Sequence, residues 1–113
     1  MSLQITGLDI PSSLEAEAAV LNAMILENDY IDSAAMVLTS DMFYSPQNQV
    51  IYKNILACYE KNKAVDLVLL KDYVKPSVPD VSEVLINHLV EICDVDSVPE
   101  FTDYYTSIVK DKY

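Results

Sequence analysis

Apolar residues recur along this chain at intervals of three and four positions, the spacing that places side chains on one face of an α-helix. Six segments carry the pattern, and we expect a helix in each of them: residues 13–27, 30–38, 46–62, 67–74, 81–93 and 101–113. Every short apolar run that could form a strand falls inside one of these helical patterns. The sequence therefore predicts an all-α fold, a compact bundle of about six helices.

Residues with special backbone or capping properties indicate where these helices begin. Ser45 and Asp66 precede the third and fourth segments, where a side-chain oxygen can accept from an N–H group that has no partner within the helix. Pro46 takes the first helical position, where its missing N–H costs nothing. Pro11 is expected to stop a helix from running through it, because its ring disfavours a helical conformation at the preceding residue. The first helix is therefore expected to start near Ser13.

Two further capping signals have the pattern Ser-x-x-Glu, in which each side chain accepts a hydrogen bond from the backbone N–H of the other residue. These pairs are Ser12 with Glu15 before the first helix, and Ser97 with Glu100 before the last. Both pairs predict a helix start.

Three polar or proline-containing connectors, residues 39–46, 75–80 and 94–99, are expected to separate the helices. In the first of them, Phe43 and Tyr44 are expected to fill the core from the loop. The chain contains no repeat, low-complexity tract or long linker, and 113 residues suffice for one core. We expect a short leader at residues 1–9 and one helical domain over residues 10–113.

The same periodicity predicts which side chains face the core. On the first, fifth and last segments the expected inward residues are Leu14, Ala18, Val20, Leu21, Met24 and Ile25, then Val84, Leu85, His88, Leu89 and Ile92, then Phe101, Tyr105, Ile108 and Val109.

Composition and charge exclude several classes of function. Gly7 is the only glycine in the sequence, and the phosphate-binding pattern GxxxxGK[ST] does not occur in it. Eighteen acidic residues against seven basic ones give a net charge of −11. A surface with this charge repels nucleic-acid phosphates and anionic lipids, so we expect no direct nucleic-acid binding and no membrane binding.

Cysteine usage and the N-terminal residues indicate a cytoplasmic location. The opening MSLQITGLDIP has neither the basic region nor the apolar region of a signal peptide, and no apolar run approaches the roughly 20 residues of a membrane span. Cys58 and Cys93 form no CxxC pair, and both fall on predicted apolar helix faces. We expect free thiols in a reducing compartment, although the sequence leaves a disulfide open.

The sequence gives little indication of a catalytic site. His88 is the only histidine and has no partners at metal-ligand or triad spacing, so a half-buried helix histidine is expected. Glu15 and Glu17 are two residues apart and point about 200° apart on a helix, which prevents a matched acid–base pair. The acidic residues near 94–103 lack the glycine of a calcium loop. We expect no catalytic, cofactor-binding or metal-binding residues in this chain.

Four segments in order resemble the N-terminal domain of the bacterial replicative DNA helicases of the DnaB type. They are PSSLEAEAAVLNAMIL (11–26), DMFYSPQNQVIY (41–52), AVDLVLL (64–70) and FTDYYTSIVKDK (101–112). The sequence departs from the usual family pattern at Asn22 in place of glycine, Asn48 in place of histidine and Val68 in place of threonine. His88 and Leu89 fall near a Tyr-Leu pair that follows two glycines in the family. The departures indicate a divergent member.

The resemblance implies a role within a larger machine. The family's domain is non-catalytic and forms a collar of paired subunits, as a dimer or within a hexamer. It also provides the surface on which the helicase-binding domain of primase docks, and helicase loaders act on the same assembly. ATP and Mg²⁺ would be bound by a motor domain outside this chain.

The resemblance also suggests where these contacts lie. We expect self-association through the last helix, whose aromatic residues exceed what one inward face can cover. The residues are Phe101, Tyr104, Tyr105, Ile108 and Tyr113. The contact with primase or another partner is expected at Glu15, Glu17 and His88.

Two other interpretations stay open from the sequence. One is a stand-alone acidic all-α adaptor that regulates a helicase, and the other is a small enzyme. A parent reading frame with a P-loop downstream favours the helicase, and a concave pocket lined by converging acids favours the enzyme.

Overall fold

The computed structural model of the chain describes residues 5–77, 82–95 and 102–112. In order, its elements are α1 (Ile5–Leu26), α2 (Asp29–Val37), the 3₁₀ turn η1 (Ser40–Met42), α3 (Pro46–Asn62), α4 (Leu67–Ser77), α5 (Ser82–Cys93) and α6 (Thr102–Lys112). These described parts contain six α-helices and no strand. The predicted all-α bundle is confirmed.

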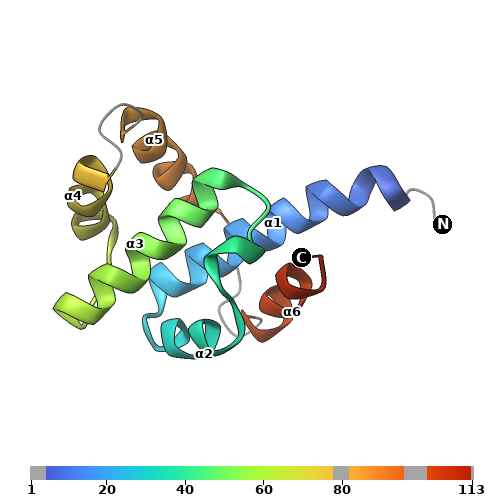
Figure 1. Cartoon of the computed structure of the whole chain (residues 1–113), viewed down its shortest axis with the longest axis horizontal. Coiled ribbons are helices and arrows are strands. Elements are labelled where there is room, and N and C mark those ends of the chain that lie inside the picture. The colour runs from blue at the N-terminus through green and yellow to red at the C-terminus, as the bar shows by residue number, and fades with distance from the viewer. Residues whose placement is uncertain (1–4, 78–81, 96–101, 113) are drawn as a thin grey trace.

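The helices are arranged around α1, which runs through the middle of the molecule (Figure 1). It contacts α2, α3, α5 and α6. At one end α4 and α5 pack against each other, and at the other α2 packs against α6. The N-terminal turns of α1 extend beyond this body (Figure 1). Because α1 touches four other helices, its residues decide most of the packing.

The C-terminal half of α1 is buried on nearly every side. From Ala16 to Ile25 every residue except Ala18 is buried, including the polar Glu17 and Asn22. Leu21 and Ile25 face the core as predicted, but the burial extends well beyond one helical face. Several alanines on the helix leave room for neighbouring helices to approach.

A pair of aromatic rings closes the core beside α1. The ring centroids of Phe43 and Tyr52 lie 4.9 Å apart, and both residues are buried. The Tyr52 hydroxyl donates to the Leu38 carbonyl over 2.8 Å, and burial raises the pKa of Tyr52 to about 12. Phe43 thus fills the core as predicted. Tyr44 does not, since the residue is 64% exposed and its backbone N–H, not its ring, contacts the buried Glu17.

The start of α1 differs from the prediction. The helix begins at Ile5 and passes through Pro11, Ser12 and Ser13, so neither serine is an N-cap and no capping box forms with Glu15. A proline inside a helix removes one hydrogen bond and disfavours the preceding turn at a cost of about 3 kcal/mol, but its own φ is helical. A long helix can therefore contain a proline at this energetic cost.

The end of α4 differs for the same reason. The helix continues through Lys75, Pro76 and Ser77, where a loop was predicted. The rest of that predicted loop, residues 78–80, lies outside the described residues, as does the predicted Ser97–Glu100 capping pair.

Other predicted helix starts are confirmed. The Ser45 hydroxyl accepts from the Asn48 N–H over 3.2 Å, and the Asp66 carboxylate accepts from the Leu69 N–H over 2.9 Å. On α5, Leu85, Leu89 and Ile92 are buried as predicted. Val84, predicted to face inward, is 53% exposed, because α4, α1 and α3 cover a narrower face of α5 than the sequence pattern marks as apolar.

Asparagine side chains join segments that are far apart in the sequence. Asn28 donates to the Val65 carbonyl over 3.1 Å and accepts from the Val65 N–H over 2.9 Å, which imitates a backbone pairing. The Asn22 amide donates to the carbonyl of Ile92 over 2.9 Å at the end of α5. The bonds from Asn28 pair both backbone groups of the buried Val65, and the bond from Asn22 adds a second donor to the Ile92 carbonyl, which also accepts from the Val95 N–H.

Both cysteines are free, as the sequence predicted. Cys58 is buried and Cys93 is half-buried. Burial raises the pKa of both thiols, which keeps them in the unreactive neutral form.

Candidate protein-docking groove

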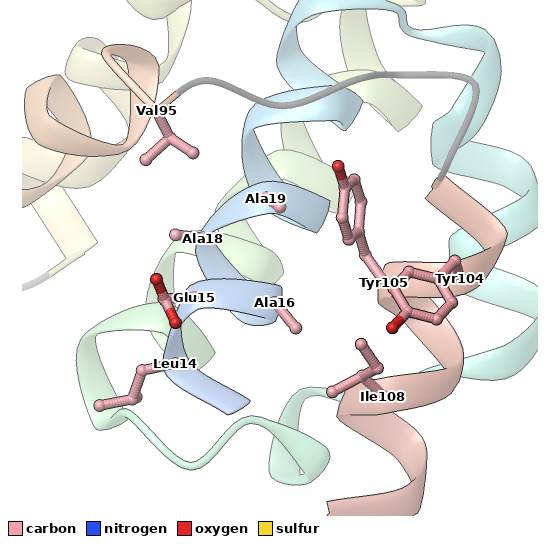
Figure 2. Close-up of a pocket in the computed structure, with 9 residues that line it drawn as sticks. All are labelled: Leu14, Glu15, Ala16, Ala18, Ala19, Val95, Tyr104, Tyr105 and Ile108. Carbon is pink, nitrogen blue, oxygen red and sulfur yellow. The ribbon is translucent and has the colours of Figure 1, made fainter. Parts of the chain in front are cut away.

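A groove with a volume of about 750 Å³ lies between α1 and α6 (Figure 2). One side comes from α1, the opposite side from α6, and Val95 after α5 closes one edge. We call it the α1–α6 groove, and its described lining consists of Leu14, Glu15, Ala16, Ala18, Ala19, Val95, Tyr104, Tyr105 and Ile108.

The small side chains of α1 create this hollow. Ala16 and Ala19 present single methyl groups toward α6, and Ala18 presents one on the side of Val95, so the α1 side of the groove is lined by small side chains where larger ones would fill the space. Glu15 lies at the rim of the groove and is exposed. The α1 side of the groove is therefore apolar at its floor and acidic at its edge.

The α6 side supplies aromatic surface. Tyr105 and Ile108 are half-buried beside the groove, and Tyr104 is 64% exposed. The rings of Tyr104 and Tyr105 have centroids 6.1 Å apart and are tilted by 58°. Tyrosines that offer both apolar area and a hydroxyl are enriched in protein–protein interfaces.

Thr102, Thr106 and Val109 occupy the buried face of α6. The hydroxyl of Thr106 is buried and has no hydrogen-bond partner among the residues that the structure describes. With this face used for packing, Tyr104 on the same helix stays exposed.

The predicted site residues fall into two groups in the structure. Glu15, predicted to contact a partner, and Tyr104, Tyr105 and Ile108, predicted for self-association, all line the α1–α6 groove (Figure 2). Phe101 and Tyr113 were also predicted for self-association, and both lie outside the described residues.

Glu17 and His88 lie elsewhere, in a polar network beneath the surface. Glu17 has no exposed surface, and its carboxylate accepts from the Tyr44 N–H over 2.6 Å, the Ser45 N–H over 3.4 Å and the Asn48 amide over 2.8 Å. It thereby supplies acceptors at the N-terminus of α3. His88 is half-buried on α5 and pairs with Asn48 over 2.7 Å. Because Glu17 is buried, it can influence a surface contact only through the residues to which it is hydrogen-bonded.

Sequence reasoning missed several contributors to these sites. Ala16, Ala19 and Val95 line the groove, and Asn48 connects Glu17 to His88. The concentration of alanine near Glu17 was the available signal for a close helix pair with a hollow. Nothing in the spacing of Asn48 pointed to its partners, which are 31 and 40 residues away.

Two features are absent from the described residues. Among the described residues no group of three or more histidine, cysteine or acidic side chains is placed to hold a metal ion. The helices described here also include none whose length and apolar character would allow it to cross a bilayer. What the groove offers is apolar area, two tyrosines and one carboxylate.

The chain is similar to known replicative helicases. The family described as DnaB-like helicase N-terminal domain matches residues 9–111. The chain is 30% identical over 108 residues to a probable replicative DNA helicase of Trieres chinensis, covering 92% of this chain and 23% of that protein. It is 32% identical over 104 residues to the replicative DNA helicase DnaC of Bacillus subtilis, covering 90% of this chain and 22% of that protein.

The fold has a counterpart among solved structures. The N-terminal domain of DnaB helicase from Mycobacterium tuberculosis superposes with a TM-score of 0.78 at 27% sequence identity, over 88% of this chain and 72% of that one. The chain spans less than a quarter of the length of the two curated relatives named above. Sequence and fold agree, and the chain belongs to the DnaB-like helicase N-terminal domain family.

Proposed function

We propose that this domain is a non-catalytic collar of a replicative DNA helicase, which pairs with another copy of itself and docks primase or a helicase loader. The ATP-driven motor, with its Mg²⁺, would be carried by another part of the polypeptide. The observation that carries the proposal is the α1–α6 groove, which brings Glu15 together with Tyr104 and Tyr105.

Self-pairing is supported by the aromatic surface of α6. Tyr104 is exposed although it is large and adjoins a groove with an apolar floor. A two-fold contact between copies would place the same patch on both partners and cover these rings. The free energy of such a contact comes mainly from a few buried aromatic residues.

Docking of primase is supported by charge and by the acidic rim. The net charge of −11 attracts a basic partner from a distance, and Glu15 offers a carboxylate beside apolar surface. The same charge keeps the domain from adhering to the DNA that the motor would move.

The pairing is tested by a matched pair of tyrosine variants. Tyr104 and Tyr44 are both 64% exposed, but only Tyr104 lines the groove. We expect Tyr104→Ala to weaken self-association at least about tenfold in sedimentation equilibrium, and Tyr44→Ala to leave it unchanged. A wild-type domain that stays monomeric at high concentration, or equal effects of the two variants, contradicts the pairing.

The docking is tested by charge reversal at two glutamates, one at the groove and one away from it. Glu15 lies at the groove and Glu27 follows the C-terminal end of α1, and both are exposed. We expect Glu15→Lys to weaken binding of the helicase-binding domain of the cognate primase, measured by calorimetry, and Glu27→Lys to have a smaller effect. Similar losses would show that only the overall charge matters.

A further inference from the structure

A chain of hydrogen bonds connects the interior of α1 to the surface of α5. The Asn48 Nδ2 atom lies 2.8 Å from Glu17 Oε1, and the Asn48 Oδ1 atom lies 2.7 Å from His88 Nε2. The three residues come from α1, α3 and α5, and the bonded pairs are 31 and 40 positions apart in the sequence. Only the tertiary fold brings them together.

The direction of donation along this chain is fixed at its buried end. The Glu17 carboxylate faces the backbone N–H groups of Tyr44 and Ser45, which can only donate. The group that Asn48 presents to the same carboxylate is its NH₂, so its carbonyl oxygen faces His88. A carbonyl oxygen only accepts, so the proton lies on His88 Nε2. A neutral imidazole carries one N–H, which leaves a lone pair on His88 Nδ1.

The outward end of the chain is a pair of acceptors. His88 Nδ1 lies 3.7 Å from Glu91 Oε1, and the two side chains are 26% and 80% exposed. In the neutral state of the ring, a lone pair and a carboxylate oxygen face each other without a proton between them. Such a pair is completed by a proton on Nδ1 or by a cationic donor that arrives from outside.

The charges around this pair favour a cation. Helix α5 contains no lysine or arginine, and Glu83 and Asp94 on or next to it are exposed. Burial and Asp94 raise the pKa of the Cys93 thiol, while Lys71 of α4, the helix that packs against α5, acts to lower it. Helix α5 itself therefore carries acidic side chains and no basic ones other than His88.

We propose that His88 and Glu91 form an acceptor pair for an arginine or lysine side chain of a protein partner, oriented from beneath by Asn48 and Glu17. The inference rests on the proposed function, in which this domain docks another protein, and it adds the chemistry of one contact. Arginine fits best, because its planar guanidinium offers several N–H donors in a fixed geometry. Asn48 and Glu17 are positioning residues, since they hold the ring in the tautomer that presents Nδ1 outward.

The tautomer is tested by nitrogen NMR of the histidine ring at pH 8.5, about two units above the ordinary imidazole pKa. We expect the resonance pattern of an imidazole protonated at Nε2. The variant Asn48→Ala is expected to give a mixture of tautomers, and the wild-type spectrum alone decides if that variant does not fold. A wild-type ring protonated at Nδ1 overturns the proposal.

The acceptor pair is tested with N-acetyl-arginine amide, and with N-acetyl-citrulline amide as its neutral isostere. We expect the arginine compound to shift the His88 Nδ1 resonance and the citrulline compound to leave it in place. Glu91→Gln is expected to weaken the arginine response about threefold. Glu83→Gln removes the same charge from the same helix and is expected to have no effect.

Equal effects of the two glutamate variants, or a response spread evenly over the acidic surface, overturn the proposal. Neither result bears on self-pairing or primase docking, which are measured with Tyr104→Ala and Glu15→Lys. Conversely, a domain that neither pairs nor docks primase removes the proposed function, while the arginine titration still reports on the acceptor pair itself.

Discussion

The two sides of α1 are packed in opposite ways. Toward α3 the helix places Glu17, which is fully buried and whose carboxylate receives hydrogen bonds from two backbone N–H groups and one amide. On the groove side it places Ala18, which is only half-buried and lines a groove of about 750 Å³. Adjacent residues of one helix therefore face a closed polar interior and an open apolar groove.

The difference shows how the fold separates stability from binding. A buried carboxylate is tolerated only when its acceptor sites are filled, so the α1–α3 side admits little change. The alanine side leaves apolar area uncovered, which a second protein can bury. The first side fixes how the helices pack, and the second is available for a partner.

Removing Glu17 is expected to have the largest effect. Glu17→Ala leaves the Tyr44 and Ser45 N–H groups and the Asn48 amide without their acceptor, and we expect the free energy of unfolding to fall by about 3–5 kcal/mol. Urea unfolding followed by circular dichroism measures the change. The exposed Glu15→Ala is the control, with an expected change within about 0.5 kcal/mol. Comparable losses of stability for the two variants would contradict the proposed difference in packing between the two sides of α1.

Alkaline unfolding is expected to report on Tyr52, which stacks on Phe43 next to the Glu17 network. Its pKa is raised by burial from an ordinary value of 10.0 to about 12. The neutral form is therefore favoured in the folded state, and stability present below pH 10 falls as the pH rises toward 12, by about 2–3 kcal/mol.

Thermal unfolding across this pH range measures the loss, with Tyr52→Phe as the control. The phenylalanine variant starts less stable, because the bond to the Leu38 carbonyl is gone, but should show a weaker pH dependence. An unchanged pH dependence would show that other groups cause the alkaline loss.

The same substitution on the two sides of α1 sharpens the comparison. Ala23 has no exposed surface, whereas Ala18 borders the groove. We expect Ala23→Leu to lower the free energy of unfolding by about 1–3 kcal/mol through overpacking, and Ala18→Leu to change it by less than about 1 kcal/mol. Ala18→Leu should nevertheless weaken self-association, because it fills the groove. Equal destabilisation would mean that the groove is closed in solution.

The smallest effect is expected at Thr106 on α6. Its buried hydroxyl has no partner within the described parts of the chain, and valine has nearly the same shape without the polar group. We expect Thr106→Val to raise the free energy of unfolding by up to about 1 kcal/mol. A clear loss of stability on thermal unfolding would show that the hydroxyl has a partner in solution.

The helices themselves were largely predictable from local pattern. The boundaries of α3 at Pro46 and Asn62 agree with the prediction, because Ser45 and Pro46 mark the start by local chemistry. The two large differences at helix ends are at Pro11 and Pro76. A proline was expected to interrupt the helix at each position, but α1 and α4 continue through them. Helix formation over many residues outweighed the cost of one lost hydrogen bond.

The candidate site was only partly predictable. The excess of aromatic residues on α6 indicated a surface for binding, and Tyr104 is indeed exposed. The pattern could not show that Glu15 would share a groove with Tyr105, since nothing local sets the distance between α1 and α6. Glu17 was expected at a partner contact from the family resemblance, but it is buried, and its partners are contributed by α3 and the segment before it.

The sequence by itself determined the class of this protein: six amphipathic segments, an acidic surface and a set of motifs that place it in one family. These properties follow from hydrophobic spacing, capping residues and charge, which act within a few residues along the chain. Only the tertiary structure decided that Glu17 would be buried, that Asn48 would link it to His88, and that alanines on α1 would leave a groove against α6. Contacts between residues far apart in sequence depend on how whole helices pack, and no local pattern encodes that packing.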